Sequence, residues 1–155
     1  MASAATAAAF SHTSASSSYC GAHSSPVGLF SILTNNLRLA SILALGGFLL
    51  GAPTVAELAL NGFVLGSTVS QLQAVPMVFV AGVLPHGVLE LAGEIVAGSI
   101  GLRFARTELN LIRNRDAEIS MKPIAVNAGV AILLVSVAAS IETFVTPALL
   151  SGLCR

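Results

Sequence analysis

The chain has 155 residues, of which 55% are hydrophobic and only 9% are charged. A water-soluble domain usually carries about a quarter charged residues. The mean hydropathy here is +0.89, which favours a lipid bilayer as the surroundings of most of the chain. The seven basic and seven acidic residues cancel, which removes any electrostatic basis for nucleic-acid binding. On composition alone, the alternative is a very apolar water-soluble helical bundle.

Residues 1–29 are rich in Ala, Ser and Thr and contain neither Lys nor Arg. They also lack an apolar core of the length that a secretory signal requires. We therefore expect a disordered segment at 1–29, followed by a transmembrane helical domain at 30–155. The two cysteines, Cys20 and Cys154, lie near the two ends and have no metal-type spacing.

Four apolar stretches follow this segment. A bilayer core about 30 Å thick requires roughly 20 apolar residues per helix. The sequence approaches this length at about 37–55, 54–72, 74–104 and 124–145. The third stretch contains Pro85, where we expect the helix to be kinked or broken. The predicted fold class is an all-α, polytopic transmembrane bundle of about four spans.

The connection at 103–122 holds five of the seven basic residues. Short loops rich in Lys and Arg stay on the cytoplasmic side of a membrane. We therefore predict a multi-pass protein of the cell membrane with this loop in the cytoplasm. Alternation then puts the connection near Pro53 inside and both chain ends outside.

The third stretch carries His86, Glu90 and Glu94 at intervals of four residues. This spacing places all three on one helix face, together with small residues such as Gly93 and Ala97. An ionisable group near the bilayer centre costs about 2.5–3.5 kcal/mol. Small residues let membrane helices approach closely. We therefore expect this face to point into the bundle and its branched apolar face to meet lipid.

The fourth stretch repeats the pattern, because Glu142 shares a face with several alanines. We expect Glu142 to meet Glu90 and His86 across the bundle. Two pairs of glycines four residues apart, Gly47 with Gly51 and Gly62 with Gly66, are typical of closely packed membrane helices, although the pattern is common in such helices.

Each of these polar groups also has a purely structural interpretation. His86 can satisfy the carbonyl groups freed by the proline. Glu94 can lie near the cytoplasmic interface and meet Arg103 or water, which is the interpretation favoured for this residue. Asn61 can be a hydrogen-bonding contact between helices as readily as a ligand contact. His86 and Glu90 have helical metal-ligand spacing, but too few ligands accompany them to predict a metal site.

Four segments resemble the stage II sporulation protein M family of integral membrane proteins. They are "TNNLRLA" at 34–40, "LNGFVLG" at 60–66, "LPHGVLELAGEIVAGSIGL" at 84–102 and "IETFVTP" at 141–147. The resemblance implies a multi-helix membrane protein, which in spore-forming bacteria works in a complex with partners that degrade the cell wall. The motif positions are Asn35, Asn36, Asn61, Gly62, Pro85, His86, Gly87, Glu90, Glu142, Thr143 and Pro147. The family supplies no agreed catalytic role for them.

The chain departs from the family at its start. Members usually have a further hydrophobic helix before the Asn-Asn segment, where this chain has the Ser/Ala-rich stretch. The chain is therefore either a shortened member or one whose true start lies upstream, and we expect the second.

Three kinds of function fit these residues. The first is a membrane scaffold that binds other membrane proteins or a second copy of the chain. The second is a small-solute or proton-coupled ion transporter that uses His86, Glu90 and Glu142 in a polar intramembrane cavity. The third, an enzyme with His86 and Glu90 as acid and base, has the least support because no nucleophile spacing is recognisable. We predict no catalytic residues, no metal and no cofactor.

Overall fold

The computed structural model describes residues 26–72, 76–116 and 118–153 of the chain. These residues form helices and short connections, without a strand in the described part. The elements are α2 (Pro26–Leu45), the 3-10 turn η1 (Gly46–Leu49), α3 (Ala52–Leu72), α4 (Pro76–Gly82), α5 (Leu84–Ile112), α6 (Met121–Ser140), the π-helical turn η2 (Ile141–Val145) and α7 (Thr146–Leu153). The all-α fold class is confirmed.

The first predicted span was placed too late in the chain. Helix α2 begins at Pro26 and ends at Leu45, whereas the sequence predicted a helix over 37–55. Proline suits the first turn of a helix, because its missing N–H has no helical partner there. The polar residues before Leu37 do not end the helix, since Thr34 donates its hydroxyl hydrogen bond to the Phe30 carbonyl at 2.7 Å. Most of the segment predicted to be disordered, residues 1–25, lies outside the described residues.

A tight reversal joins α2 to α3. Leu50 and Gly51 both have positive φ, at 55° and 80°, and Gly51 tolerates this conformation without strain. The Leu50 N–H donates to Oε2 of Glu108 on α5 at 2.9 Å. Helix α3 then begins at Ala52 and ends at Leu72, close to the predicted span over 54–72.

The predicted interruption of the third span is confirmed. Helix α4 ends at Gly82, Val83 forms a turn, and α5 begins at Leu84 with Pro85 in its first turn. Proline cannot donate the hydrogen bond that would continue the helix through this point. Beyond it, α5 runs to Ile112, so the connection predicted over 103–122 begins as helix.

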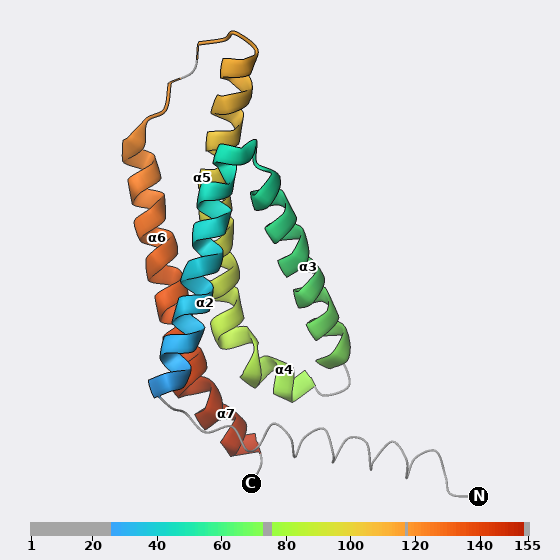
Figure 1. Ribbon diagram of the computed structural model, residues 1–155. Helices are drawn as coiled ribbons and strands as arrows, with labels where there is room; N and C mark the ends of the chain where they lie inside the picture. Colours follow the sequence, from blue (N-terminus) through green and yellow to red (C-terminus); the bar gives the residue numbers. More distant parts are fainter. Residues whose placement is uncertain (1–25, 73–75, 117, 154–155) are drawn as a thin grey trace, which may run out of the picture.

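Helix α5 is the centre of the fold and packs along both α2 and α6 (Figure 1). A Cβ atom at Gly101 of α5 would collide with the Leu43 carbonyl, and one at Gly47 of η1 would collide with the Gly101 carbonyl. A Cβ atom at Gly93 would lie 2.8 Å from Cγ1 of Val135 on α6. These glycines therefore set the close approach of three helices.

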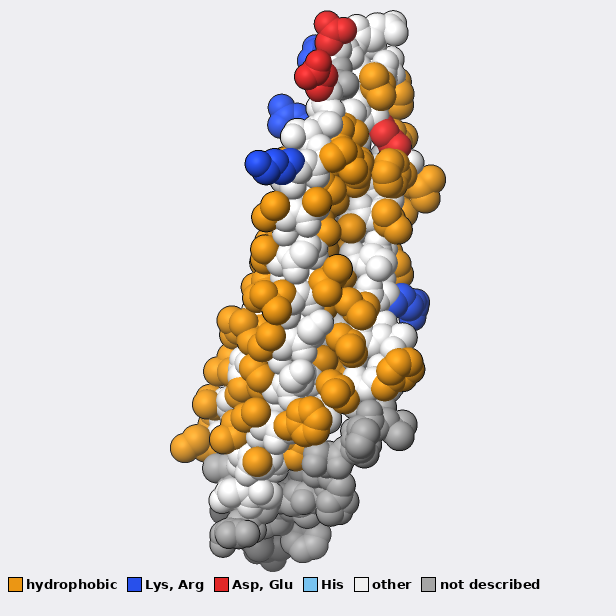
Figure 2. Space-filling model, turned by 90° about the vertical axis from the view of Figure 1, so that its left-hand side faces the viewer, with side chains coloured by type: hydrophobic (Ala, Val, Ile, Leu, Met, Phe, Trp, Pro, Cys, Tyr) orange, Lys and Arg blue, Asp and Glu red, His pale blue; other side chains and the backbone are white. Residues whose placement is uncertain are grey.

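The predicted division of α5 into two faces is confirmed. Gly93, Ala97 and Gly101 are buried, while the branched residues of the opposite face are exposed: Leu84, Val88, Leu91, Ile95 and Leu102. In Figure 2, hydrophobic side chains cover most of the visible face, and acidic and basic side chains gather mainly toward its upper end. This distribution suits helices that meet lipid along their length and water near the α5–α6 connection.

Two helical segments in the described part of the chain are long and apolar enough to cross a membrane, Gly28–Leu49 and Met121–Gly152. The span predicted over 54–72, which corresponds to α3, is not one of these two segments. The span predicted over 74–104, which corresponds to α4 and most of α5, is not one of them either. The count of four spans is therefore a prediction that the structure does not decide.

Candidate functional site

His86, Glu90 and Glu94 lie along one side of the first half of α5, as their spacing predicted. All three line a groove of about 240 Å³ between α2, α3 and α5. Asn35 contributes to the groove from α2 and Asn61 contributes from α3. The groove thus gathers polar side chains from three of the four sequence segments that carry the family resemblance.

The fourth segment reaches His86 and Glu90 through Glu142. Glu142 lies close enough to both for their charges to interact. It sits in the π-helical turn η2, whose wider turn changes the direction of the side chains that follow. The expected approach of Glu142 to this cluster is therefore present, although Glu142 is not among the residues that line the groove.

His86 is held by the C-terminal segment. Its Nδ1 atom lies 3.3 Å from Oγ1 of Thr146, a buried residue at the start of α7. The sequence interpretation did not single out Thr146, although it stands inside the "IETFVTP" motif. Its neighbour Thr143 is also buried and donates its hydroxyl hydrogen bond to the Ala139 carbonyl at 2.8 Å.

Asn36 is the one buried polar side chain of the site that lacks a full set of partners in the described part of the chain. Its side chain interacts with the Glu90 carboxyl group, but its buried Nδ2 atom has no partner at hydrogen-bond geometry. An unsatisfied buried donor costs about 1–3 kcal/mol. A small shift of the Glu90 side chain would remove this cost.

Glu94 does not meet Arg103, which is one of the two contacts that the sequence interpretation favoured for it. Its side chain is 7% exposed and has Glu90 and Glu57 as its charged neighbours. Arg103 lines a separate cavity near the α5–α6 connection. Because nine residues of helix span about 14 Å, and because α5 continues to Ile112, Glu94 is well removed from the end of the helix.

A second groove of about 210 Å³ adjoins the first and shares Asn35, Leu39 and Asn61 with it. It adds the charged side chains of Arg38 and Glu57. The Asn61 amide donates to the Glu57 carbonyl of its own helix at 3.1 Å, and among the described residues no hydrogen bond joins its side chain to another helix. Glu57 was not predicted as a site residue, although its spacing of four from Asn61 places both on one helix face.

The remaining motif residues shape the backbone around the site. Pro85 lies in the first turn of α5, Gly87 has only the Val83 side chain near its missing Cβ, at 3.5 Å, and Pro147 follows Thr146 in α7. Gly62 of α3 has no other part of the described chain within 4 Å of a Cβ position, and the same is true of Gly66. These two glycines therefore do not join α3 to its neighbours within the chain.

The site offers carboxyl groups, one imidazole and amides within a mostly apolar fold. Such groups can exchange protons and form hydrogen bonds to a polar ligand or to a partner helix. Thr146 is 7% exposed and is not among the residues that line the groove. Among the described residues, no three His, Cys, Asp or Glu side chains are placed to share a metal ion.

Comparison with known proteins supports the resemblance found in the sequence. The family described as Stage II sporulation protein M matches residues 1–147. An uncharacterized protein of Methanocaldococcus jannaschii, MJ0793, is 27% identical over 124 residues, which cover 76% of this chain and 70% of that protein. No solved structure matches the chain. The match over nearly the whole chain shows that this protein belongs to the stage II sporulation protein M family.

Proposed function

We propose that this protein is an integral component of a membrane complex, which crosses the cell membrane several times and binds partner membrane proteins without catalysing a reaction. In this arrangement the α5–α6 connection faces the cytoplasm, as its basic residues favour. Family membership and two long apolar segments support a place in the membrane. Many large hydrophobic side chains are exposed, including Phe30 and Phe63, each at 75%.

The observation that carries the proposal is the polar groove between α2, α3 and α5. Lipid cannot satisfy its carboxyl and amide groups, so within a bilayer either water or a polar group of another protein must fill it. Helix α3, which forms one wall, leaves Gly62 and Gly66 uncovered and exposes Leu60 and Phe63. Glycines four residues apart allow a second helix to approach closely. Neither glycine lines the groove, so a second helix at these glycines would pack against the outer face of the wall that α3 forms.

Larger side chains at Gly62 and Gly66, on the uncovered face of α3, test this proposal. A Cβ atom at Gly62 or Gly66 meets nothing within 4 Å in the described part of the chain, so we expect the protein with leucine at both positions to fold and insert normally. Recovery of partner proteins with the tagged full-length chain from its native membrane should fall strongly. Gly129→Leu on α6 is the matched control, because a Cβ there also meets nothing within 4 Å. Equal recovery with both variants would contradict the proposal.

The same groove supports transport as a second candidate function. Three of its ionisable groups, His86, Glu90 and Glu94, lie in line along α5 next to a break in a helix, as in many transport pathways. Transport requires the charge of Glu90, whereas partner binding requires only its hydrogen bonding. Glu90→Gln should therefore abolish proton or solute flux in reconstituted vesicles if the protein is a transporter, and should leave partner recovery intact if it is a scaffold.

A further inference from the structure

A cavity near the α5–α6 connection lies away from the polar groove and plays no part in the proposed partner binding. It has a volume of about 490 Å³ and is formed by the last turns of α5, the connecting segment and the start of α6. Polar side chains from each of these three segments line it, including Thr107, Asn110 and Ser120. Phe104 and Ile124 form its buried apolar base.

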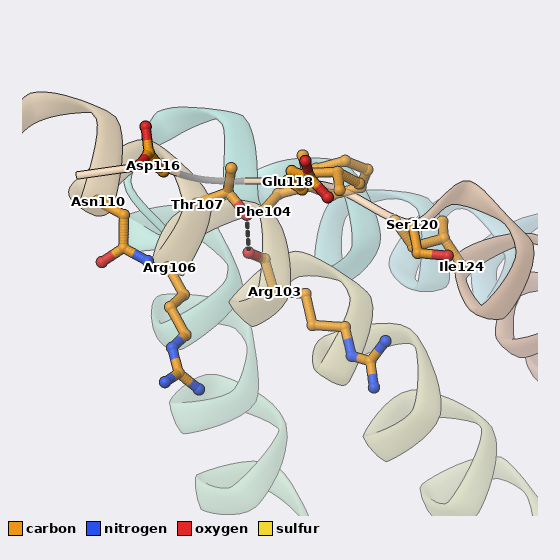
Figure 3. A pocket seen from close by; sticks show the side chains of 10 residues that line it. Arg103, Phe104, Arg106, Thr107, Asn110, Asp116, Glu118, Ser120 and Ile124 are labelled. Carbon is orange, nitrogen blue, oxygen red and sulfur yellow. Dashed lines mark hydrogen bonds between the residues drawn. The ribbon is translucent and has the colours of Figure 1, made fainter. Parts of the chain in front are cut away.

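Charges of opposite sign stand on opposite sides of this cavity. Figure 3 shows the guanidinium groups of Arg103 and Arg106 toward one side, and the carboxylates of Asp116 and Glu118 toward the other. No ion pair joins these four described side chains, and all four are exposed. Two positive charges on one side and two negative charges on the other favour a ligand that carries both a negative and a positive group.

Each of the two arginines can bind a phosphate group, and Figure 3 shows their guanidinium groups pointing apart from one another. Arginine presents a planar fork of donors that matches phosphate oxygens. Ser120, the N-cap residue of α6, makes no capping hydrogen bond, so its hydroxyl group is available to a ligand. The free N–H groups of the first turn of α6 add a partial positive charge beside it.

A separate apolar groove lies nearer the middle of the bundle and shares no lining residue with the cavity. It has a volume of about 380 Å³ and lies between α2, α5 and α6. Ile100 lines this groove and packs in one cluster with Phe104 and Ile124, which line the polar cavity. A molecule with a charged head and an apolar chain would therefore meet suitable surroundings at both ends.

We propose that this cavity binds the headgroup of an aminophospholipid, with the phosphate at Arg103 or Arg106, the primary ammonium group at Asp116 and Glu118, and an acyl chain in the apolar groove. The proposal rests on the membrane placement proposed above, with the connection at the bilayer surface. Phosphatidylethanolamine is the simplest lipid with this chemistry. Its ammonium group can donate hydrogen bonds to both carboxylates, which the quaternary ammonium of phosphatidylcholine cannot do.

Native mass spectrometry of the full-length protein in detergent tests the proposal. Phosphatidylethanolamine, phosphatidylcholine and phosphatidylglycerol with identical acyl chains are added in turn, and the bound fraction is measured. We expect phosphatidylethanolamine to bind about tenfold more tightly than the other two, the effect of one or two charge-assisted hydrogen bonds. Glycerophosphoethanolamine, which lacks the acyl chains, should not be retained. Equal binding of the three lipids would overturn the proposal.

Double variants test which residues bind the phosphate group of the lipid and which bind its ammonium group. Arg103→Gln with Arg106→Gln should weaken binding of phosphatidylethanolamine about tenfold, since both phosphate partners are lost. Arg113→Gln with Arg115→Gln removes the same charge from residues that do not line the cavity, and should change nothing. Asp116→Asn with Glu118→Gln should remove the preference over phosphatidylglycerol. If the Arg113 and Arg115 variant loses as much lipid binding as the Arg103 and Arg106 variant, the lipid is attracted by net charge alone. That result would overturn the assigned site.

A flotation assay separates this proposal from the proposed function. Protein that floats with vesicles after an alkaline wash is embedded in the membrane, so absence of lipid selectivity in such protein counts against the headgroup site alone. Protein that fails to float contradicts the membrane placement, and with it the proposed function.

Discussion

Nδ1 of His86 on α5 lies 3.3 Å from Oγ1 of Thr146 at the start of α7, sixty residues further along the chain. This contact ties the first turn of α5 to the C-terminal segment directly after the π-helical turn. It therefore fixes the position of an imidazole that lines the polar groove.

Thr146→Val should destabilise the protein by about 1 kcal/mol, because it removes this hydrogen bond and leaves the half-buried imidazole without its partner. The midpoint of thermal unfolding in detergent measures the effect. Ser151→Ala is the control, since Ser151 is exposed and donates only to the Ala148 carbonyl within its own helix. An unchanged midpoint in Thr146→Val would show that the contact contributes nothing.

Gly101→Ala should destabilise the protein by about 1–3 kcal/mol or more. The added methyl group would collide with the Leu43 carbonyl and lie 2.6 Å from Oγ1 of Thr54, so α2 and α5 must move apart. Gly98→Ala in the same helix is the matched control, because its methyl would meet only the Leu58 side chain, at 3.4 Å. Chemical denaturation in mixed micelles compares the two. Similar stability of both variants would contradict the close approach.

Thr54→Val tests the hydrogen bond that joins α3 to α2. The buried Thr54 hydroxyl donates to the Leu43 carbonyl at 2.9 Å, and valine keeps the shape but removes the donor. We expect a loss of about 1–2 kcal/mol, measured by the same denaturation. Thr107→Val removes a hydroxyl that bonds only within α5, at 3.1 Å to the Arg103 carbonyl, and should cost clearly less.

Much of α5 could be predicted from the sequence. The spacing of four between His86, Glu90 and Glu94, shared with glycines and alanine, identified the buried face, because helical periodicity alone determines it. The interruption near Pro85 followed from the missing N–H group. Local chemistry was sufficient for both features.

The start of α2 and the position of Glu94 could not be predicted in the same way. Asn36 and Arg38 resemble residues at the end of a span, yet Asn36 is buried beside Glu90 in the middle of a helix. Its place depends on packing against α5, which the local sequence does not reveal. The sequence interpretation favoured a contact of Glu94 with Arg103 or water, whereas its charged neighbours in the fold are Glu90 and Glu57.

The π-helical turn at Ile141–Val145 was also unpredictable from composition. Its residues are ordinary helix formers or β-branched residues, and no local signal marks a wider turn. The approach of Glu142 to His86 was expected from helix faces, but the role of Thr146 in holding His86 was not. Such a contact depends on how α7 leaves α6, which is a tertiary property.

The most direct test of partner binding at the polar groove is site-specific photocrosslinking in living cells. A photoreactive amino acid replaces Val64, which lines the groove and is 57% exposed, or Val130 on α6, which is 41% exposed and lies elsewhere. We expect a discrete protein adduct, to a partner or to a second copy of the chain, from position 64 and none from position 130. Absence of a protein adduct at 64, or identical adducts at both positions, would contradict the proposal.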